Sequence, residues 1–109
     1  MAALPSLRQL RYLLALAEHL NFTRAAEASF VSQSTLSTGL KELEGTLGVQ
    51  LVERDKQSVA LTAVGKDVVT RARQVLAAAE DLSDFASDAS RPMQGRLRLG
   101  VIPTIAPFV

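Results

Sequence analysis

The apolar residues between positions 68 and 89 recur at alternating intervals of four and three residues. The series consists of Val68, Ala72, Val75, Ala79, Leu82, Ala86 and Ala89. This is the spacing of a and d positions in a coiled coil, and a helix over residues 63–89 would be roughly 40 Å long at 1.5 Å per residue. The stripe could belong to the chain's own core, but this length favours a second copy of the chain as its partner. The sequence therefore predicts a homodimer formed along this helix.

Two shorter helices are predicted near the start of the chain. Residues 7–20 carry a core-facing stripe, and Ser6 can cap the start of that helix. A short second helix follows, with Asn21 and Thr23 as possible N-caps, and it ends at position 28 or 29. The turn after this second helix is brief, which is typical of two helices packed close together.

A third helix is predicted to begin at the N-cap Ser32 and to end at Gly48. Its apolar stripe consists of Leu36, Leu40, Leu43 and Leu47. The opposite side carries Ser34, Thr38, Lys41 and Gly45, with Thr35 and Ser37 on the flanks and Gln33 in the first turn. Many of these residues are mediocre helix formers, and each glycine costs about 1 kcal/mol relative to Ala. The composition indicates a surface kept for contact, although the sequence offers no reason for Gly39.

The apolar period changes after the third helix. Val49 and Leu51, followed by Val59 and Leu61, predict two short strands joined by a polar loop over residues 53–58. Thr62 can then cap the long helix. The chain is predicted to be mainly α: a winged helix-turn-helix over residues 1–61, a linker helix over 62–90, and over 91–109 a hinge with the first strand and helix start of a further domain.

The third helix has the chemistry of a recognition helix. Such helices enter the major groove with their N-terminal end first. Short hydroxyl side chains permit close approach, and Gln33 can pair with adenine through two hydrogen bonds. Ser and Thr near a helix start also act as caps, and Ser32 is assigned that role. The residues therefore favour DNA binding over the alternative, a winged-helix dimerisation module that binds no DNA.

Composition excludes several function classes. The chain has no cysteine, which rules out disulfides, thiol catalysis and Cys-ligated zinc. No acid, base or nucleophile set converges in the sequence, so we expect neither an enzyme nor a cofactor nor a metal site; His19 is predicted to act as a helix-end charge, and Glu42 and Glu44 as solvated side chains. No apolar run has membrane length and no signal peptide is recognisable, so we expect a cytoplasmic protein.

Five segments resemble the N-terminal domain of LysR-type transcriptional regulators. They are LRQLRYLLALAE (7–18), NFTRAAE (21–27), VSQSTLS (31–37), LKELEGTLGVQLVER (40–54) and LTAVG (61–65). Together they extend over about four-fifths of the chain, and their spacing agrees as well as their residues. The segment LRYLLALAEHLNFTRAAE and the tail GRLRLGVIPTIAPFV are most similar to the peroxide-sensing OxyR-type branch. The alternative within the family is a regulator of metabolic genes that responds to a small-molecule effector.

The resemblance implies a dimer through the linker helix, a tetramer in the full-length protein, and double-stranded DNA with an inverted-repeat operator as the partner. The DNA-binding residues that the resemblance implies are Arg24, Gln33, Ser34, Thr35, Ser37 and Thr38, with Lys56 and Gln57 at the wing tip. Lys41 is added from its place on the exposed side of the third helix. The implied dimer interface consists of Val68, Ala72, Val75, Ala79, Leu82 and Ala86. An oxidant or small-molecule effector would bind only to the domain that is missing from this chain.

Four residues depart from the family's pattern. Ser34 stands where many members have Pro, Thr38 where many have Arg, Gly39 where many have Gln, and Gln57 where many have a wing Arg. Each change removes charge or reach. We therefore expect weaker direct base readout and a larger share of phosphate contacts and DNA shape.

Overall fold

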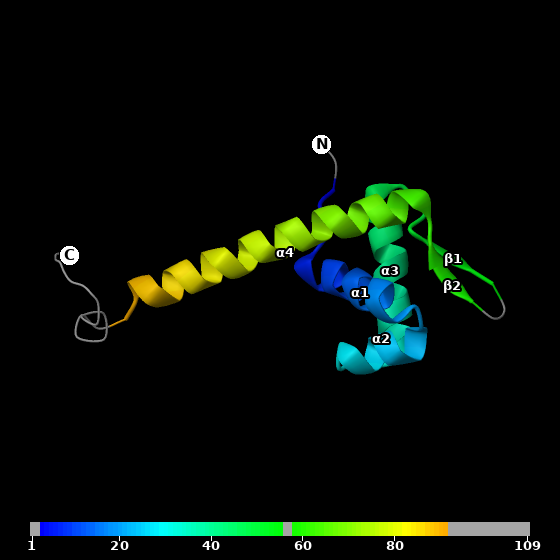
Figure 1. Cartoon of the computed structure of the whole chain (residues 1–109), viewed down its shortest axis with the longest axis horizontal. Coiled ribbons are helices and arrows are strands. Elements are labelled where there is room, and N and C mark those ends of the chain that lie inside the picture. The colour runs from blue at the N-terminus through cyan, green and yellow to red at the C-terminus, as the bar shows by residue number, and fades with distance from the viewer. Residues whose placement is uncertain (1–2, 56–57, 92–109) are drawn as a thin grey trace. The chain divides into compact units, whose positions relative to one another are not determined.

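The computed structural model describes residues 3–55 and 58–91. The described elements follow in the order α1 (Leu7–His19), α2 (Phe22–Ala28), α3 (Gln33–Leu47), β1 (Val52–Arg54), β2 (Val59–Leu61) and α4 (Ala63–Ala89) (Figure 1). The protein is mainly α, as predicted. Its contacts divide it into two units, the first ending at Ala77 and the second starting at Ala78. The first unit thus includes the first half of α4.

Local capping explains where the three short helices begin. The Ser6 hydroxyl accepts from the Gln9 backbone N–H, and the Gln9 side chain accepts from the Ser6 N–H, which completes a capping box at α1. Asn21, not Thr23, caps α2 by accepting from the Arg24 N–H at 2.8 Å. Ser32 caps α3 as predicted.

Left-handed residues separate the same helices. Leu20 has φ +50° at the end of α1, and Phe30 has φ +59° in the turn between α2 and α3. Gly48 ends α3 at φ +73°, a conformation that glycine adopts without steric cost. His19 lies in the last turn of α1, at the helix end where the sequence places it.

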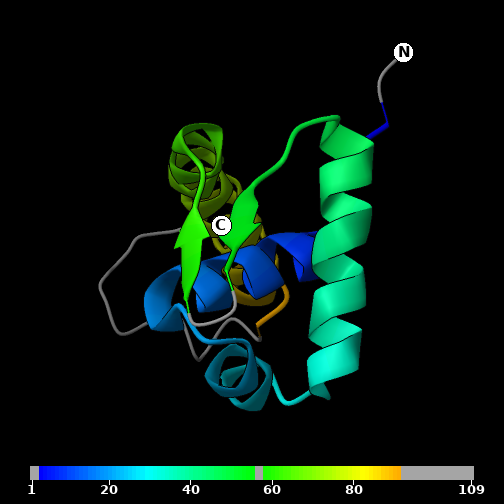
Figure 2. The same ribbon diagram turned by 90° about the vertical axis from the view of Figure 1, so that its right-hand side faces the viewer.

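The second strand of the wing, Val59–Leu61, lies where it was predicted, but the first strand is shifted along the sequence to Val52–Arg54. The two strands pair antiparallel with Val52 opposite Leu61 and Arg54 opposite Val59, and Figure 2 shows them side by side. The prediction that Val49 and Leu51 form the first strand and that the loop starts at Glu53 is therefore wrong. The physical reason is a side-chain contact that periodicity does not reveal.

That contact comes from Glu44 of α3. Its carboxylate Oε2 accepts the backbone N–H groups of Leu51 and Val52 at 2.8 and 3.2 Å. These bonds hold Leu51, which is fully buried, on the core side of the wing before pairing begins. The expectation that Glu44 is simply solvated is wrong, because its carboxylate is part-buried and satisfies two donors. Glu42, by contrast, is exposed.

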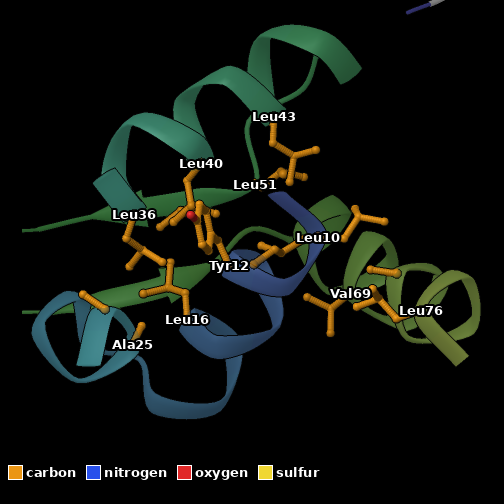
Figure 3. Close-up of a cluster of buried hydrophobic side chains, with 14 residues drawn as sticks. Leu10, Tyr12, Leu16, Ala25, Leu36, Leu40, Leu43, Leu51, Val69 and Leu76 are labelled. Atoms are coloured by element: carbon orange, nitrogen blue, oxygen red, sulfur yellow. The ribbon is translucent and has the colours of Figure 1, made fainter. Parts of the chain in front are cut away.

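The core of the first unit is made mainly of leucines from α1 and α3. Its largest fully buried side chains are Leu13, Leu16, Leu36, Leu40, Leu43 and Leu51. Val69, Ala72 and Leu76 of α4 belong to the same buried cluster (Figure 3). Leu36, Leu40 and Leu43 are the predicted stripe of α3, and Leu47 is partly buried beside it.

The first half of α4 therefore has its apolar partner within the chain. Ala72, predicted at the dimer interface, is only 2% exposed and packs in the core, so it is not available to a second chain. Val68 is partly buried against the same core. The alternative that the stripe belongs to the chain's own core, which the sequence left open, therefore holds for these two residues. Val69 and Leu76, which lie outside the predicted stripe, are buried in the same core.

The second unit is described as far as Arg91 and consists of the remaining turns of α4. Ala79 is half-buried, whereas Leu82 and Phe85 are 69% and 70% exposed. Of the hinge, strand and helix start predicted over residues 91–109, only Arg91 is among the described residues. The predicted wing tip, Lys56 and Gln57, also lies outside them. Within the described ranges, no helix is both long and apolar enough to cross a membrane.

Two glycines sit where another chain segment comes very close. A Cβ on Gly39 would lie 2.6 Å from Cδ2 of the Tyr12 ring, so the buried ring of α1 occupies the space that a side chain would need. A Cβ on Gly65 would collide with the carbonyl of Leu51. Close packing of α1 and of the wing thus explains both residues, and Gly39 is the one that the sequence left without a reason.

Gly39 and Gly45 of α3 make a matched test of this explanation. Ala at position 39 gains helix propensity of about 1 kcal/mol but must displace a packed ring, which typically costs 1–3 kcal/mol, so Gly39→Ala should lower the free energy of unfolding. Nothing lies within 4 Å of a Cβ on Gly45, and Gly45→Ala should raise it by up to about 1 kcal/mol. Urea unfolding followed by circular dichroism measures both, and equal stabilisation by the two variants would contradict the packing argument.

Candidate nucleic-acid interface

The first turn of α3 is organised by Ser32. Its hydroxyl accepts from the Thr35 N–H at 3.1 Å and donates to the Thr35 hydroxyl at 2.9 Å. The Ser34 hydroxyl lies 3.2 Å from the same oxygen. These bonds fix the orientation of a row of small polar side chains, and a fixed row loses little rotamer entropy when it meets a ligand.

Gln33 is held from the neighbouring helix. The Thr23 hydroxyl of α2 donates to Oε1 of Gln33 at 3.2 Å. A carbonyl oxygen has two lone pairs, so Oε1 can still accept a second bond while the amide nitrogen donates. In the major groove adenine presents the complementary pair, an N6–H donor for Oε1 and an N7 acceptor for the amide nitrogen. Thr23, which the sequence offered only as a possible cap, thus has a positioning role.

The predicted recognition residues on α3 lie on its surface. Gln33, Ser34, Thr35, Thr38 and Lys41 are exposed, and Ser37 is half-buried. At about 100° per residue, Ser34, Thr38 and Lys41 lie on the side opposite the buried leucines. Gln33 and Ser37 lie on one flank and Thr35 on the other. Arg24 is exposed on α2, with its backbone N–H bound to Asn21.

Arg54 joins the wing to the two helices, a role that sequence reasoning missed. Its Nη2 donates to the Ser37 hydroxyl at 3.3 Å, and its guanidinium carbon lies 4.5 Å from the centroid of the Phe22 ring. This cation of β1 thus contacts both α2 and α3. The sequence shows Arg54 as a basic residue within the predicted wing loop over 53–58. Only the fold places Phe22 and Ser37 beside it.

A polar depression of about 330 Å³ lies where these three elements meet. Gln33 and Ser37 line it from α3, Asn21 and Phe22 from the α2 end, and Arg54 from the wing. The lining includes a guanidinium, hydroxyls and amides, which are usual partners of phosphate oxygens, and also the Asp55 carboxylate, which opposes an anion.

The residues predicted for dimerisation lie on α4. Val75, Leu82 and Ala86 are exposed, and Ala79 is half-buried. Phe85 was not in the predicted stripe, yet it is as exposed as Leu82. These two large apolar side chains are three residues apart and so lie near each other on the helix surface.

Residues 7–66 match the model of the bacterial regulatory helix-turn-helix proteins of the lysR family. The chain belongs to this family. The match extends over α1, α2, α3, the wing and the start of α4, which are the elements that carry the polar surface.

Two relatives and one solved structure agree with this LysR-type assignment. The chain is 61% identical over 109 residues to the transcriptional regulator EstR of Acinetobacter baylyi, covering all of this chain and 36% of EstR. It is 44% identical over 104 residues to the DNA-binding transcriptional dual regulator OxyR of Escherichia coli, covering 95% of this chain and 34% of OxyR. The chain thus spans about a third of the length of these relatives.

The solved structure is the crystal structure of the CbnR DNA-binding domain with DNA. It superposes on this LysR-type chain with a TM-score of 0.74 at 37% sequence identity, over 79% of this chain and 99% of CbnR's. The resemblance to LysR-type regulators, and the winged helix-turn-helix with a long helix, are thereby confirmed.

The Arg54 contacts can be tested without any ligand. A cation over an aromatic ring at an exposed site contributes about 0.5–1 kcal/mol. We expect Arg54→Ala to lower the free energy of unfolding by roughly that amount, and Phe22→Leu to make the Arg54 change nearly neutral, because the ring is then absent. Arg71→Ala, an exposed arginine on α4, is the matched control. Additive effects in the Phe22–Arg54 double-mutant cycle would show that the stacking contributes nothing.

Proposed function

We propose that this chain is the sequence-specific DNA-binding part of a dimeric bacterial transcriptional regulator. The observation that carries the proposal is the division of α3 into a fully buried leucine face and an exposed face of small polar residues with Gln33 and Lys41. That division leaves the exposed face available to a groove. The CbnR domain, whose fold this chain shares, was solved with DNA, which supports the same reading.

Recognition divides into two kinds of contact. Gln33 and Lys41 reach toward base edges, and Ser34, Thr35, Ser37 and Thr38 approach bases or phosphates closely. Arg24, Arg54 and the wing tip with Lys56 and Gln57 bind the backbone. Because the exposed face has a single cation, phosphate contacts and DNA shape supply most of the affinity, and base readout supplies a smaller share.

The DNA test uses a duplex selected by this chain from a randomised pool. We expect log K to fall with log salt concentration by about 0.9 for each phosphate contacted. Gln33→Ala should reduce the preference for the selected duplex over random DNA by about 1–3 kcal/mol, the usual discrimination of a bidentate base contact. Gln74→Ala, an exposed change on α4, should leave it unchanged.

A salt slope near zero, together with no preference over random duplex, would refute DNA binding. That result, with intact dimerisation, would favour a winged-helix module that has no DNA role. Catalysis is not part of the proposal, and both relatives are named as transcriptional regulators.

We propose that a second copy of the chain packs along α4. The exposed apolar side chains Val75, Leu82 and Phe85, with Ala79 and Ala86 beside them, supply the surface for it. A dimer places two recognition helices on one duplex, and the distance between them sets the spacing of an inverted repeat. Tetramer formation belongs to the longer protein.

Leu82→Asp tests the dimer. An aspartate in an apolar helix interface would have to be desolvated without a partner, so sedimentation velocity should show monomers at concentrations where the original chain is dimeric. Ser83→Asp changes the neighbouring exposed residue and should keep the dimer. If both variants remain dimeric, the interface lies elsewhere; if both are monomeric, charge on α4 and not the apolar contact is decisive.

The physiological signal is proposed from the relatives. The likeness to proteins named as hydrogen peroxide-inducible genes activators, at 44–49% identity, supports an oxidative-stress regulator. A regulator of metabolic genes with a small-molecule effector is the alternative. In either case the effector would bind in the remaining two-thirds of a protein of the relatives' length.

A further inference from the structure

A second depression lies on the other flank of α3, between α3 and α1. Its volume is about 350 Å³, and its polar lining includes Ser6 and Arg8 from α1 and Thr35, Thr38 and Glu42 from α3. The depression near Arg54 is lined by other residues of α3, Gln33 and Ser37. The recognition helix is thus bordered by a polar hollow on each side.

The dimensions of DNA suggest what the two hollows could contact. An α-helix with its side chains is about 10–12 Å across, and the major groove is about 12 Å wide. A helix seated in the groove therefore fills it, and both sugar-phosphate walls meet whatever flanks the helix. With α3 seated in the groove, the hollow near Arg54 would face the wall next to the wing, and the hollow at α1 would face the opposite wall.

Arg8 supplies the charge that a phosphate would require there. It is exposed, and no ion pair of Arg8 is found among the described residues. Its guanidinium has five N–H donors in a planar fork that suits phosphate oxygens. The Thr35 and Thr38 hydroxyls on the other side of the hollow are further donors. Glu42 lines the same hollow with a carboxylate, which opposes an anion and so limits the affinity of the site.

The floor of the hollow is the contact of Tyr12 with Gly39. Both residues line the depression, and a Cβ at position 39 would collide with the ring. The absence of a side chain at Gly39 thus lets α1 lie close to α3, with Arg8 beside the exposed face of the recognition helix.

We propose that the α1–α3 depression binds a phosphate of the DNA strand opposite the wing, with Arg8 as its cation. This inference rests on the proposed function. It adds α1 to the DNA-contacting elements, and it gives each half-site a clamp on both walls of the major groove. Arg8 contributes affinity and register in this arrangement and reads no base.

The experiment compares the salt dependence of binding for variants of the full chain on the selected duplex. Arg8→Ala should make the log–log slope shallower by about 0.9 for each Arg8 contact, or by about 1.8 for a dimer on a complete inverted repeat. Affinity for selected and random duplex should fall by similar factors. Arg11→Ala is the matched control, because Arg11 is also exposed on α1 but does not line the depression.

A second variant makes the charge of the same hollow more positive instead of less positive. Glu42→Gln removes the carboxylate at constant size, so it should strengthen binding several-fold, whereas a merely structural role for the hollow gives no reason for opposite signs at Arg8 and Glu42. Unfolding midpoints confirm that each variant is folded. In an ethylation-interference experiment, Arg8→Ala should also lose one phosphate per half-site at which ethylation blocks binding, on the strand away from the wing.

Two results would overturn the inference while DNA binding stands. One is an unchanged salt slope in Arg8→Ala with the original chain still salt-dependent. The other is an equal loss in Arg8→Ala and Arg11→Ala, which would indicate a general effect of charge. A flat slope in the original chain would instead refute the proposed function itself.

Discussion

The packing of α1 against α3 is the interaction on which the rest of the molecule depends. Leu13 and Leu16 from α1 meet Leu36, Leu40 and Leu43 from α3, and all five are essentially inaccessible to water. Each fully buried leucine contributes about 1.5–3 kcal/mol relative to an exposed one. This contact fixes the rotation of α3 about its axis. The rotation in turn decides which side chains of α3 face outward, so the polar surface is a consequence of the leucine core.

The same helix also positions the wing. Glu44 of α3 binds the N–H groups at the start of β1, and Ser37, two turns earlier on the same side of the helix, binds Arg54 at the end of β1. The wing is therefore registered against the recognition helix at both ends of one strand. A recognition helix and a wing that bind one duplex together, as proposed, need this fixed relation, because misplacement of either would break the contacts of the other.

The sequence determined the elements and their surfaces. Apolar periodicity, the caps at Ser6 and Ser32 and the stop at Gly48 are local properties, so they could be predicted for α1, α3 and α4 without knowing the fold. The division of α3 into leucine and hydroxyl faces follows from helical geometry alone. The family resemblance rests on such local segments, and this is why it was confirmed together with the general architecture.

Only the tertiary structure decided the contacts that join distant segments. Gly39 is explained by Tyr12, and Arg54 by Phe22 and Ser37; the residues of these pairs are far apart in sequence. The start of the wing is explained by Glu44, which crosses the turn after α3 and has no periodic signal. The heptad stripe shows the same limit. Spacing shows which residues share a face of α4, but it does not show what packs against that face. In the first half of α4 the chain's own core packs there.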